Sequence, residues 1–438
     1  MPISTVVLHQ ADRRFFLAAL ATFAGKNRTQ WLGAGHSASN GQLPKTWTQV
    51  AQLPAQQVID VLAASAPNHC IDAWSYVSRA VSSLLSGDGH ACRHLAYYAQ
   101  LRAGMCILAN VGVGIFNRIN FVVDATGAVQ RLDPVPGGGN RGGIGTHEVV
   151  WDALNAWGTG VVTAQYFADA IKIRGVSLRD LLLIVWPGIS IQNVASDIIQ
   201  SWGLDLQRGK TDHSERNVSS YAQHALNPVN PPTNNVVTYV SETWKVLEPT
   251  SASAYDALDR YLLRALLQNH HRRVSGDTNY AAGPIGQRYA QLPQNLMSLV
   301  ARDFLDGTVA DPDPQVVRLA LSNSSPAGPI EMLSRAILLV RAASGFTHTS
   351  FADAGINISA GAMRPWINQW AEERGFWSPS RPLVDPIDLW ADIEIALLDL
   401  EQSINPPPNS MSDWIKKTQN GLPTIAEVER AGVWSLSA

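Results

Sequence analysis

Apolar residues in the first half of the chain are spaced as in amphipathic helices. They recur every three or four positions, with Ala, Leu and Gln between them, which would place them on one face of a helix. The segments that have this pattern are 54–66, 72–86, 90–110, 147–158, 161–173 and 190–202. The sequence therefore predicts a mainly α-helical fold.

Residues 119–134, INFVVDATGAVQRLDP, follow a different pattern. β-branched and apolar residues stand on both sides of Ala-Thr-Gly, and glycine readily adopts the left-handed conformation that a tight turn needs. We expect a β-hairpin inserted between helices. The glycine-rich residues 137–145 after it lack the lysine of a phosphate-binding loop, so they predict a loop without a phosphate site.

The composition changes at residues 227–235, NPVNPPTNN, where proline and asparagine disfavour a helix. We therefore predict a linker over 227–251, between an N-terminal helical domain at 1–226 and a C-terminal helical domain at 252–438. Helical spacing resumes near residue 252. The absence of internal repeats and heptads argues against a solenoid or a coiled coil.

Composition and charge exclude several classes of protein. The 438 residues are 46% hydrophobic and 16% charged with a formal net charge of −3, as in a globular protein that is no general polyanion binder. No segment has the roughly 18 to 20 apolar residues of a membrane span. The odd set Cys70, Cys92 and Cys106 suits free buried thiols, so we expect a cytoplasmic protein. Arg13 and Arg14 before a short apolar run leave a twin-arginine export signal as an alternative.

The segment 212–224, DHSERNVSSYAQH, is the strongest candidate for chemistry. On a helix, Arg216 and His224 would lie two turns apart and could border one groove. An arginine can hold a phosphate and a histidine can move a proton near neutral pH, which together suit metal-independent cleavage of RNA by its own 2′-hydroxyl. The alternative is a structural network in which Glu215 and Arg216 pair with Arg102 or His147.

Two further pairs compete with this segment. His90 and His94 share a helix face and could bind zinc in a hydrolase, but no third ligand is evident. Arg264 and His270 lie within a leucine-rich helix, where we expect a structural role before a cationic last turn.

Several of these residues carry a resemblance to a known superfamily. The run from His94 to Ala103, the following VGVGIFN, Gly145-Thr-His147 with two tryptophans, and SERN…Y at 214–221 resemble the HEPN-like helical proteins of bacteria, particularly the YaaC-like type, over about residues 68–226. Many members are RNases of toxin–antitoxin and antiphage systems, and others are scaffolds. The catalytic pattern of the superfamily is an Arg followed by a polar residue, with a His after four to six intervening residues. Arg216 and Asn217 match its first part, whereas His224 lies one residue beyond the expected position of the His. The resemblance implies a HEPN-like bundle and a homodimer.

We therefore expect a component of a bacterial antiphage defence or stress system that binds RNA and cleaves it without a metal or another cofactor. A noncatalytic scaffold or sensor subunit, which binds a partner protein through its helices, is the alternative. The predicted catalytic residues are Arg216, His224 and His147. The predicted substrate-binding residues are Arg102, Asn217, Tyr221 and Glu215.

Overall fold

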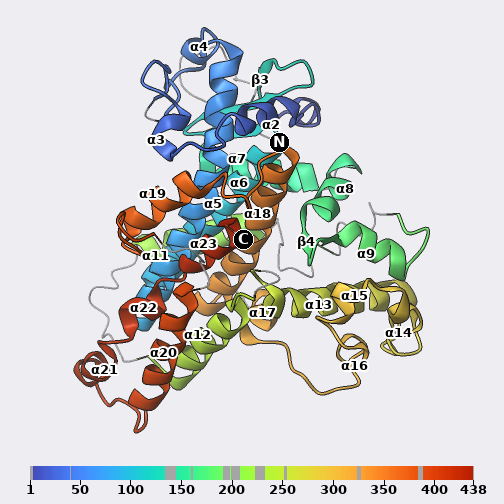
Figure 1. The fold of residues 1–438 in the computed structure, drawn as a ribbon, viewed down its shortest axis with the longest axis vertical. Coiled ribbons are helices and arrows are strands. Elements are labelled where there is room, and N and C mark those ends of the chain that lie inside the picture. Colours follow the sequence, from blue (N-terminus) through green and yellow to red (C-terminus); the bar gives the residue numbers. More distant parts are fainter. Residues whose placement is uncertain are drawn as a thin grey trace.

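Three long helices form the centre of the computed structural model: α5 (Ala55–Leu85), α6 (Gly89–Asn110) and α18 (Pro329–Asp353) (Figure 1). A short turn joins α5 to α6, which pack together, and α18 packs against both. Their facing positions carry small and aliphatic side chains that are buried in one continuous core. The mainly α-helical fold predicted from the sequence is confirmed.

The structure describes residues 3–39, 41–133, 145–158, 161–190, 198, 208–221, 232–250, 254–322, 327–382 and 388–437, with the backbone alone at 161–165, 218–221 and 437. His224, the loop before Gly145 and most of the predicted helix 190–202 lie outside these residues. Within them, no helix is both long and apolar enough to cross a membrane.

α5 joins two segments that we predicted as separate helices. It continues through Pro67, which has no backbone N–H to donate and costs a helix interior about 3 kcal/mol. The Asn68 side-chain amide donates to the Ala64 carbonyl at 2.8 Å beside this position. Most side chains along α5 are buried, and we infer that their burial outweighs the local cost of proline.

The predicted hairpin is present and has a third strand. β2 (Ile119–Val123) pairs antiparallel with β3 (Val129–Arg131), and the turn between them places Gly127 at φ +81°. β1 (Val113–Phe116) pairs antiparallel with β2 on its other side. A Cβ at Gly114 would collide with the ring of Phe121 opposite, so this strand depends on a glycine that sequence rules treat as a strand breaker.

The N-terminal segment packs on the core. Its helices are α1 (Thr5–Leu8), α2 (Arg14–Ala21), α3 (Arg28–Trp31) and α4 (Trp47–Val50). Phe16 of α2 is buried against α5, and the Arg13 guanidinium pairs with Asp353 of α18 at 2.7 Å. Phe16, Ala19 and Leu20, from the apolar run that follows the two arginines, are therefore part of the folded core. The three cysteines are buried and free, as predicted.

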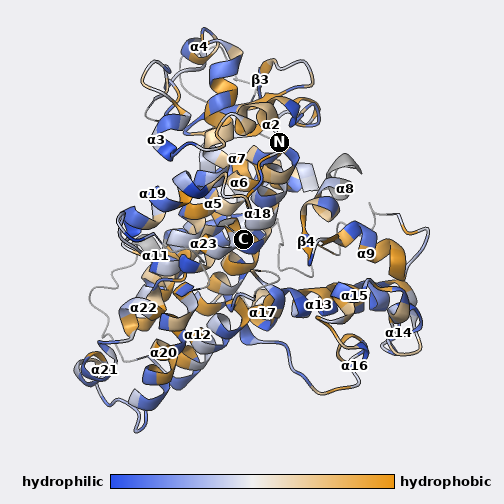
Figure 2. Cartoon of the chain, viewed as in Figure 1, coloured by the Kyte–Doolittle hydropathy of each residue, from blue (hydrophilic) through white to orange (hydrophobic). Residues whose placement is uncertain are grey.

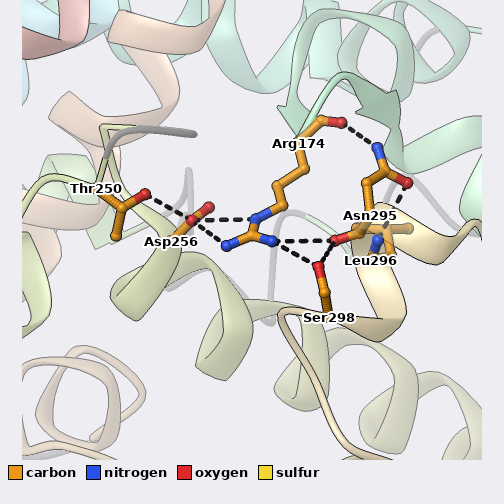
Figure 3. A network of polar contacts seen from close by, with 6 residues as sticks. All are labelled: Arg174, Thr250, Asp256, Asn295, Leu296 and Ser298. Atoms are coloured by element: carbon orange, nitrogen blue, oxygen red, sulfur yellow. Dashed lines mark hydrogen bonds and ion pairs between the residues drawn. The ribbon is translucent and has the colours of Figure 1, made fainter.

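A second short hairpin follows α7 (Thr146–Gly158) and α8 (Val161–Ala170). It consists of β4 (Lys172–Ile173) and β5 (Val176–Ser177), and α9 (Leu178–Val185) follows it. Arg174 occupies its turn at φ +47° and reaches toward α13 (Asp256–Ser275) and α15 (Gln294–Met297) (Figure 3). Its guanidinium donates to Asp256 at 2.6 and 3.0 Å and to Ser298 at 2.7 Å, while Asn295 donates to the Arg174 carbonyl at 2.7 Å. This network is an internal brace that fixes the hairpin to the later helices.

Part of the predicted linker is a buried helix. α12 (Asn234–Leu247) starts at the end of the proline and asparagine run, and the Trp244 indole donates to the Ile425 carbonyl at 2.9 Å. α18 and the C-terminal helix α23 (Arg430–Ser437) also pack against α5. Residues 234–247 of the predicted linker thus form a helix, and burial of its apolar face makes this segment part of the common core.

The other helices of the described chain extend from this core. They are α11 (Arg208–Tyr221), α13 (Asp256–Ser275), α14 (Pro284–Arg288), η2 (Tyr289–Gln291), α15 (Gln294–Met297), α16 (Arg302–Leu305), α17 (Gln315–Ala320), α19 (Arg364–Arg374), α20 (Asp388–Ser403), α21 (Met411–Thr418) and α22 (Leu422–Ala426). α13 to α16 form an arm to one side, and α20 to α22 lie at the end opposite α4 (Figure 1).

Candidate functional site

Polar and aromatic side chains of α6, α7 and α11 meet in one place, which we call the His/Arg cluster. It consists of His94, Tyr97, Tyr98, His147, Trp151, His213, Arg216 and Asn217. The three histidines are half-buried, whereas the Arg216 side chain is buried. The cluster therefore combines a sheltered positive charge with imidazoles that solvent can reach.

Helical spacing brings these side chains together. His94 and Tyr98 lie four residues apart on α6, and His213 and Arg216 lie three apart on α11, so each pair shares a helix face. α11 is held to α18 by a buried ion pair in which Arg335 donates to both Asp212 oxygens, at 2.7 and 3.1 Å. Because Asp212 precedes His213 directly, this pair fixes the helix that carries three members of the cluster, His213, Arg216 and Asn217.

Arg216 lies against two tyrosine rings. Its guanidinium carbon is 5.4 Å from the Tyr97 ring centroid and 5.2 Å from that of Tyr98, within cation–π range. One terminal nitrogen donates to the Tyr98 hydroxyl at 3.0 Å and the other to the Asn217 side-chain oxygen at 2.7 Å. The Arg216 guanidinium is thus held in place by two tyrosine rings, the Tyr98 hydroxyl and the Asn217 side-chain amide.

His147 is connected to the core through Tyr97. The Trp151 indole donates to the Tyr97 hydroxyl at 3.3 Å, and this hydroxyl lies 3.1 Å from His147 Nδ1. Two proton arrangements satisfy the chain: Tyr97 donates to Nδ1, or a protonated Nδ1 donates to Tyr97. Only the second leaves Nε2 able to accept a proton, so the tautomer of His147 decides what chemistry this ring can perform.

The environment favours neutral imidazoles. Burial, and then repulsion from Arg216 and from His213, lowers the pKa of His147 to about 4. Burial followed by the same guanidinium also lowers the pKa of His94 and of His213. Near pH 7 the three rings are therefore uncharged and can accept a proton when an anion offsets the field of Arg216.

Aromatic and basic groups continue from the cluster onto α5. Tyr76 stacks on Tyr98 with centroids 5.4 Å apart, and the Arg79 guanidinium lies 5.7 Å from the Tyr76 ring centroid. Both tyrosines are partly exposed and Arg79 is exposed. Such an arrangement can stack a base and attract a neighbouring phosphate.

The predicted site residues are only partly brought together. Arg216, Asn217 and His147 belong to the cluster. Glu215 accepts a hydrogen bond from the Ala327 amide at 3.0 Å, just before α18. Arg102 donates to His69 at 3.2 Å and lies 3.8 Å from Asp72.

Two predicted residues cannot be placed at the site. The backbone of Tyr221 forms the last residue of α11, but its side chain, like all of His224, lies outside the described residues. In the alternative network, Glu215 and Arg216 were to pair with Arg102 or His147. Arg102 faces α5, where it contacts His69 and Asp72. Arg216, in contrast, lies near enough to His147 to lower the pKa of that histidine.

Sequence reasoning missed His213 and both tyrosines as site residues. A usable signal was present, because positions 213, 216 and 217 share one face of a helix and positions 94 and 98 share another. No sequence pattern, however, paired α6 with α11 across more than a hundred residues.

The two other candidate pairs, Arg264 with His270 and His90 with His94, lie in different surroundings. Arg264 pairs with Asp313 at 2.5 Å, and its guanidinium carbon lies 4.2 Å from the Phe304 ring centroid. His270 is buried against the ring of Trp186. No group of three or more His, Cys, Asp or Glu in the described part of the chain could hold a metal ion, and this includes the surroundings of His90 and His94.

Comparison of the chain with protein-family models, curated protein sequences and solved structures found no match. The likeness to HEPN-like proteins therefore enters the function only as a proposal.

Proposed function

We propose that the His/Arg cluster is an RNA site and that the protein cleaves RNA there without a metal ion, as part of a bacterial antiphage defence or stress system. The observation that carries this proposal is the pairing of partly exposed, neutral imidazoles with a buried guanidinium. The HEPN-like resemblance adds the defence context and a homodimer to the proposal.

The proposed reaction is attack of an RNA 2′-hydroxyl on the adjacent phosphorus, with loss of the 5′-oxygen. His147 Nε2 takes the proton of the 2′-hydroxyl, which requires the tautomer that carries its proton on Nδ1. His213, charged once a phosphate lies nearby, gives a proton to the leaving oxygen. An anion in the site raises imidazole pKa values, so His213 takes up a proton from water when the substrate phosphate is bound and can then release it to the leaving oxygen.

Arg216 has an indirect role in this scheme. Its terminal nitrogens already donate to Tyr98 and Asn217, and the side chain is buried. We assign it the task of holding Tyr98 in place and providing a positive field for the charge that develops on the phosphate. This differs from the direct phosphate grip expected from the sequence.

The test is cleavage of a fluorescent single-stranded RNA in the presence of EDTA. We expect activity in the wild type and a loss of about 100-fold or more in His147→Gln and in His213→Gln, a typical effect of removing an acid or base. His9→Gln, which changes an exposed histidine that is not part of the cluster, is the matched control and should cleave as wild type does. Equal activity in all four proteins would refute the assignment.

A scaffold function is the second candidate, because Arg216 is buried and follows Asp212, the internal ion-pair partner of Arg335, on the same helix. It predicts that the protein binds a partner protein without RNA and does not cleave RNA. His147→Gln and His213→Gln should then be indistinguishable from wild type in the partner-binding assay and in the cleavage assay. Arg216→Ala does not separate the two candidates, because loss of a buried cation destabilises the fold in either case.

A further inference from the structure

α20 has apolar residues on two opposite faces. Leu389, Ile393, Ala396, Leu397 and Leu400 are buried against the rest of the protein. On the outward side, Ile395 and Leu398 are 61% and 54% exposed. A helix that packs on a core with one face normally has polar residues on the other, so the outward pair needs an explanation.

The outward residues form a continuous stripe. Ala391, Ile395, Leu398 and Gln402 are all exposed, and their spacing of four, three and four is that of a seam between two packed helices. At 100° per residue these positions fall within an arc of about 60°. Figure 2 shows apolar residues recurring along this helix at the end of the molecule.

Acidic side chains border the stripe on both sides. Asp388, Asp392 and Asp399 follow one edge and Glu394 and Glu401 the other, and α20 itself contains no Lys or Arg. Arg430 meets Asp392 at 3.3 Å and Lys245 meets Glu401 at 3.4 Å. Burial, and then repulsion from Glu394, raises the pKa of nearby Glu248.

The acidic residues beside the stripe indicate what kind of partner can bind there. A second copy of α20 packed on this stripe would set acidic edges against acidic edges, and an anionic membrane would be repelled in the same way. A helix with an apolar seam and lysines or arginines beside it would match both the spacing and the charge.

We propose that the outward face of α20 is a docking surface for a basic amphipathic helix of a partner protein. The apolar stripe is the surface that is removed from water when the partner helix binds. The acidic edges set the orientation of that helix and the preference for a basic partner. This inference is independent of catalysis at the His/Arg cluster.

The experiment uses the full chain and a fluorescein-labelled synthetic peptide of about four heptads, with Ile and Leu at the seam positions and Lys beside them. A matched peptide carries Glu in place of Lys. We expect the Lys peptide to bind in fluorescence anisotropy, the Glu peptide to bind at least about tenfold more weakly, and added salt to reduce the difference.

Protein variants then locate the contact. Ile395→Gln with Leu398→Gln should weaken binding of the Lys peptide by about tenfold or more without lowering Tm, because both side chains are exposed and glutamine is a good helix former. Glu394→Gln with Asp399→Asn should weaken it and lessen its salt dependence. Val274→Gln, at another exposed apolar residue, is the control and should bind as wild type does.

Three results would overturn the proposal. One is equal binding of the Lys peptide to wild type and to the Ile395→Gln, Leu398→Gln protein. Another is a dimer, measured by light scattering, that this double variant converts to a monomer, since the stripe would then be covered by a second copy. The third is binding of anionic vesicles that the same variant abolishes, which would assign the face to a membrane.

Discussion

The imidazole rings of His147 and His213 lie parallel, with their centroids 5.1 Å apart and their planes at 2°. One ring comes from the start of α7 and the other from α11, so the contact exists only in the folded chain. Protonation of either ring would put a positive charge against its neighbour and near Arg216. The stacked pair is therefore stable as neutral rings and sensitive to any change in the local field.

Removing the guanidinium should raise the imidazole pKa values. Arg216→Met keeps an apolar side chain beside the tyrosines but deletes the charge that opposes protonation, so the pKa of His147, His213 and His94 should move upward. The values should stay below those of exposed histidines, because burial is the larger cause. Titration of histidine ring protons by NMR measures this. Arg264→Met, which alters a distant arginine, should leave all three pKa values unchanged. A lower pKa for any of the three histidines in Arg216→Met would contradict this explanation.

Acid should destabilise the fold partly through His147. Its pKa of about 4 is below the ordinary value near 6.5, so as the pH falls through this window the unfolded chain takes up a proton before the folded chain does. The contribution of His147 to stability is then fully present above about pH 6.5 and is lost toward pH 4. His147→Gln should flatten the dependence of the unfolding free energy by less than about 1.4 kcal/mol per pH unit. Urea unfolding at several pH values tests this, with His9→Gln as the control expected to keep the wild-type slope.

The Asp212 and Arg335 pair should be costly to break and cheap to replace. Both side chains are at least 96% buried, so Asp212→Ala leaves an uncompensated buried cation and should cost about 3–5 kcal/mol of stability. Asp212→Leu combined with Arg335→Met should recover most of this loss. A double-mutant cycle in urea measures the coupling. The single variants of the cycle are Asp212→Leu and Arg335→Met. If the double variant loses as much unfolding free energy as the two single variants together, the pair does not hold α11 to α18.

The contact between α11 and Trp151 should tolerate no added carbon at Gly209. A Cβ there would overlap the Trp151 ring, so Gly209→Ala should destabilise by about 1–3 kcal/mol although alanine favours helix. The near-UV circular dichroism of tryptophan should change as well. Gly33→Ala, where a Cβ meets nothing within 4 Å, is the matched control. If Gly209→Ala proves more stable than wild type, helix propensity rather than packing governs this contact.

The sequence predicted features that depend on neighbouring residues. The spacing of apolar residues indicated helices, and Ala125 to Gly127 indicated the hairpin turn. In the structure the Asp124 carboxylate accepts backbone hydrogen bonds across this turn at 2.8 and 3.1 Å. Where local rules conflicted with burial they failed. Pro67 does not end α5 and Gly114 does not exclude β1, because the surrounding contacts compensate for their unfavourable propensity.

The sequence by itself determined the helical class, the hairpin and the polar character of the segment around Arg216, since each of these follows from residues within a few positions of one another. Only the tertiary structure decided that Tyr98 receives the Arg216 hydrogen bond, that His213 stacks on His147 and that Glu215 turns to Ala327. Those contacts join segments far apart in the chain, and their partners are selected by the packing of the whole core rather than by any local preference.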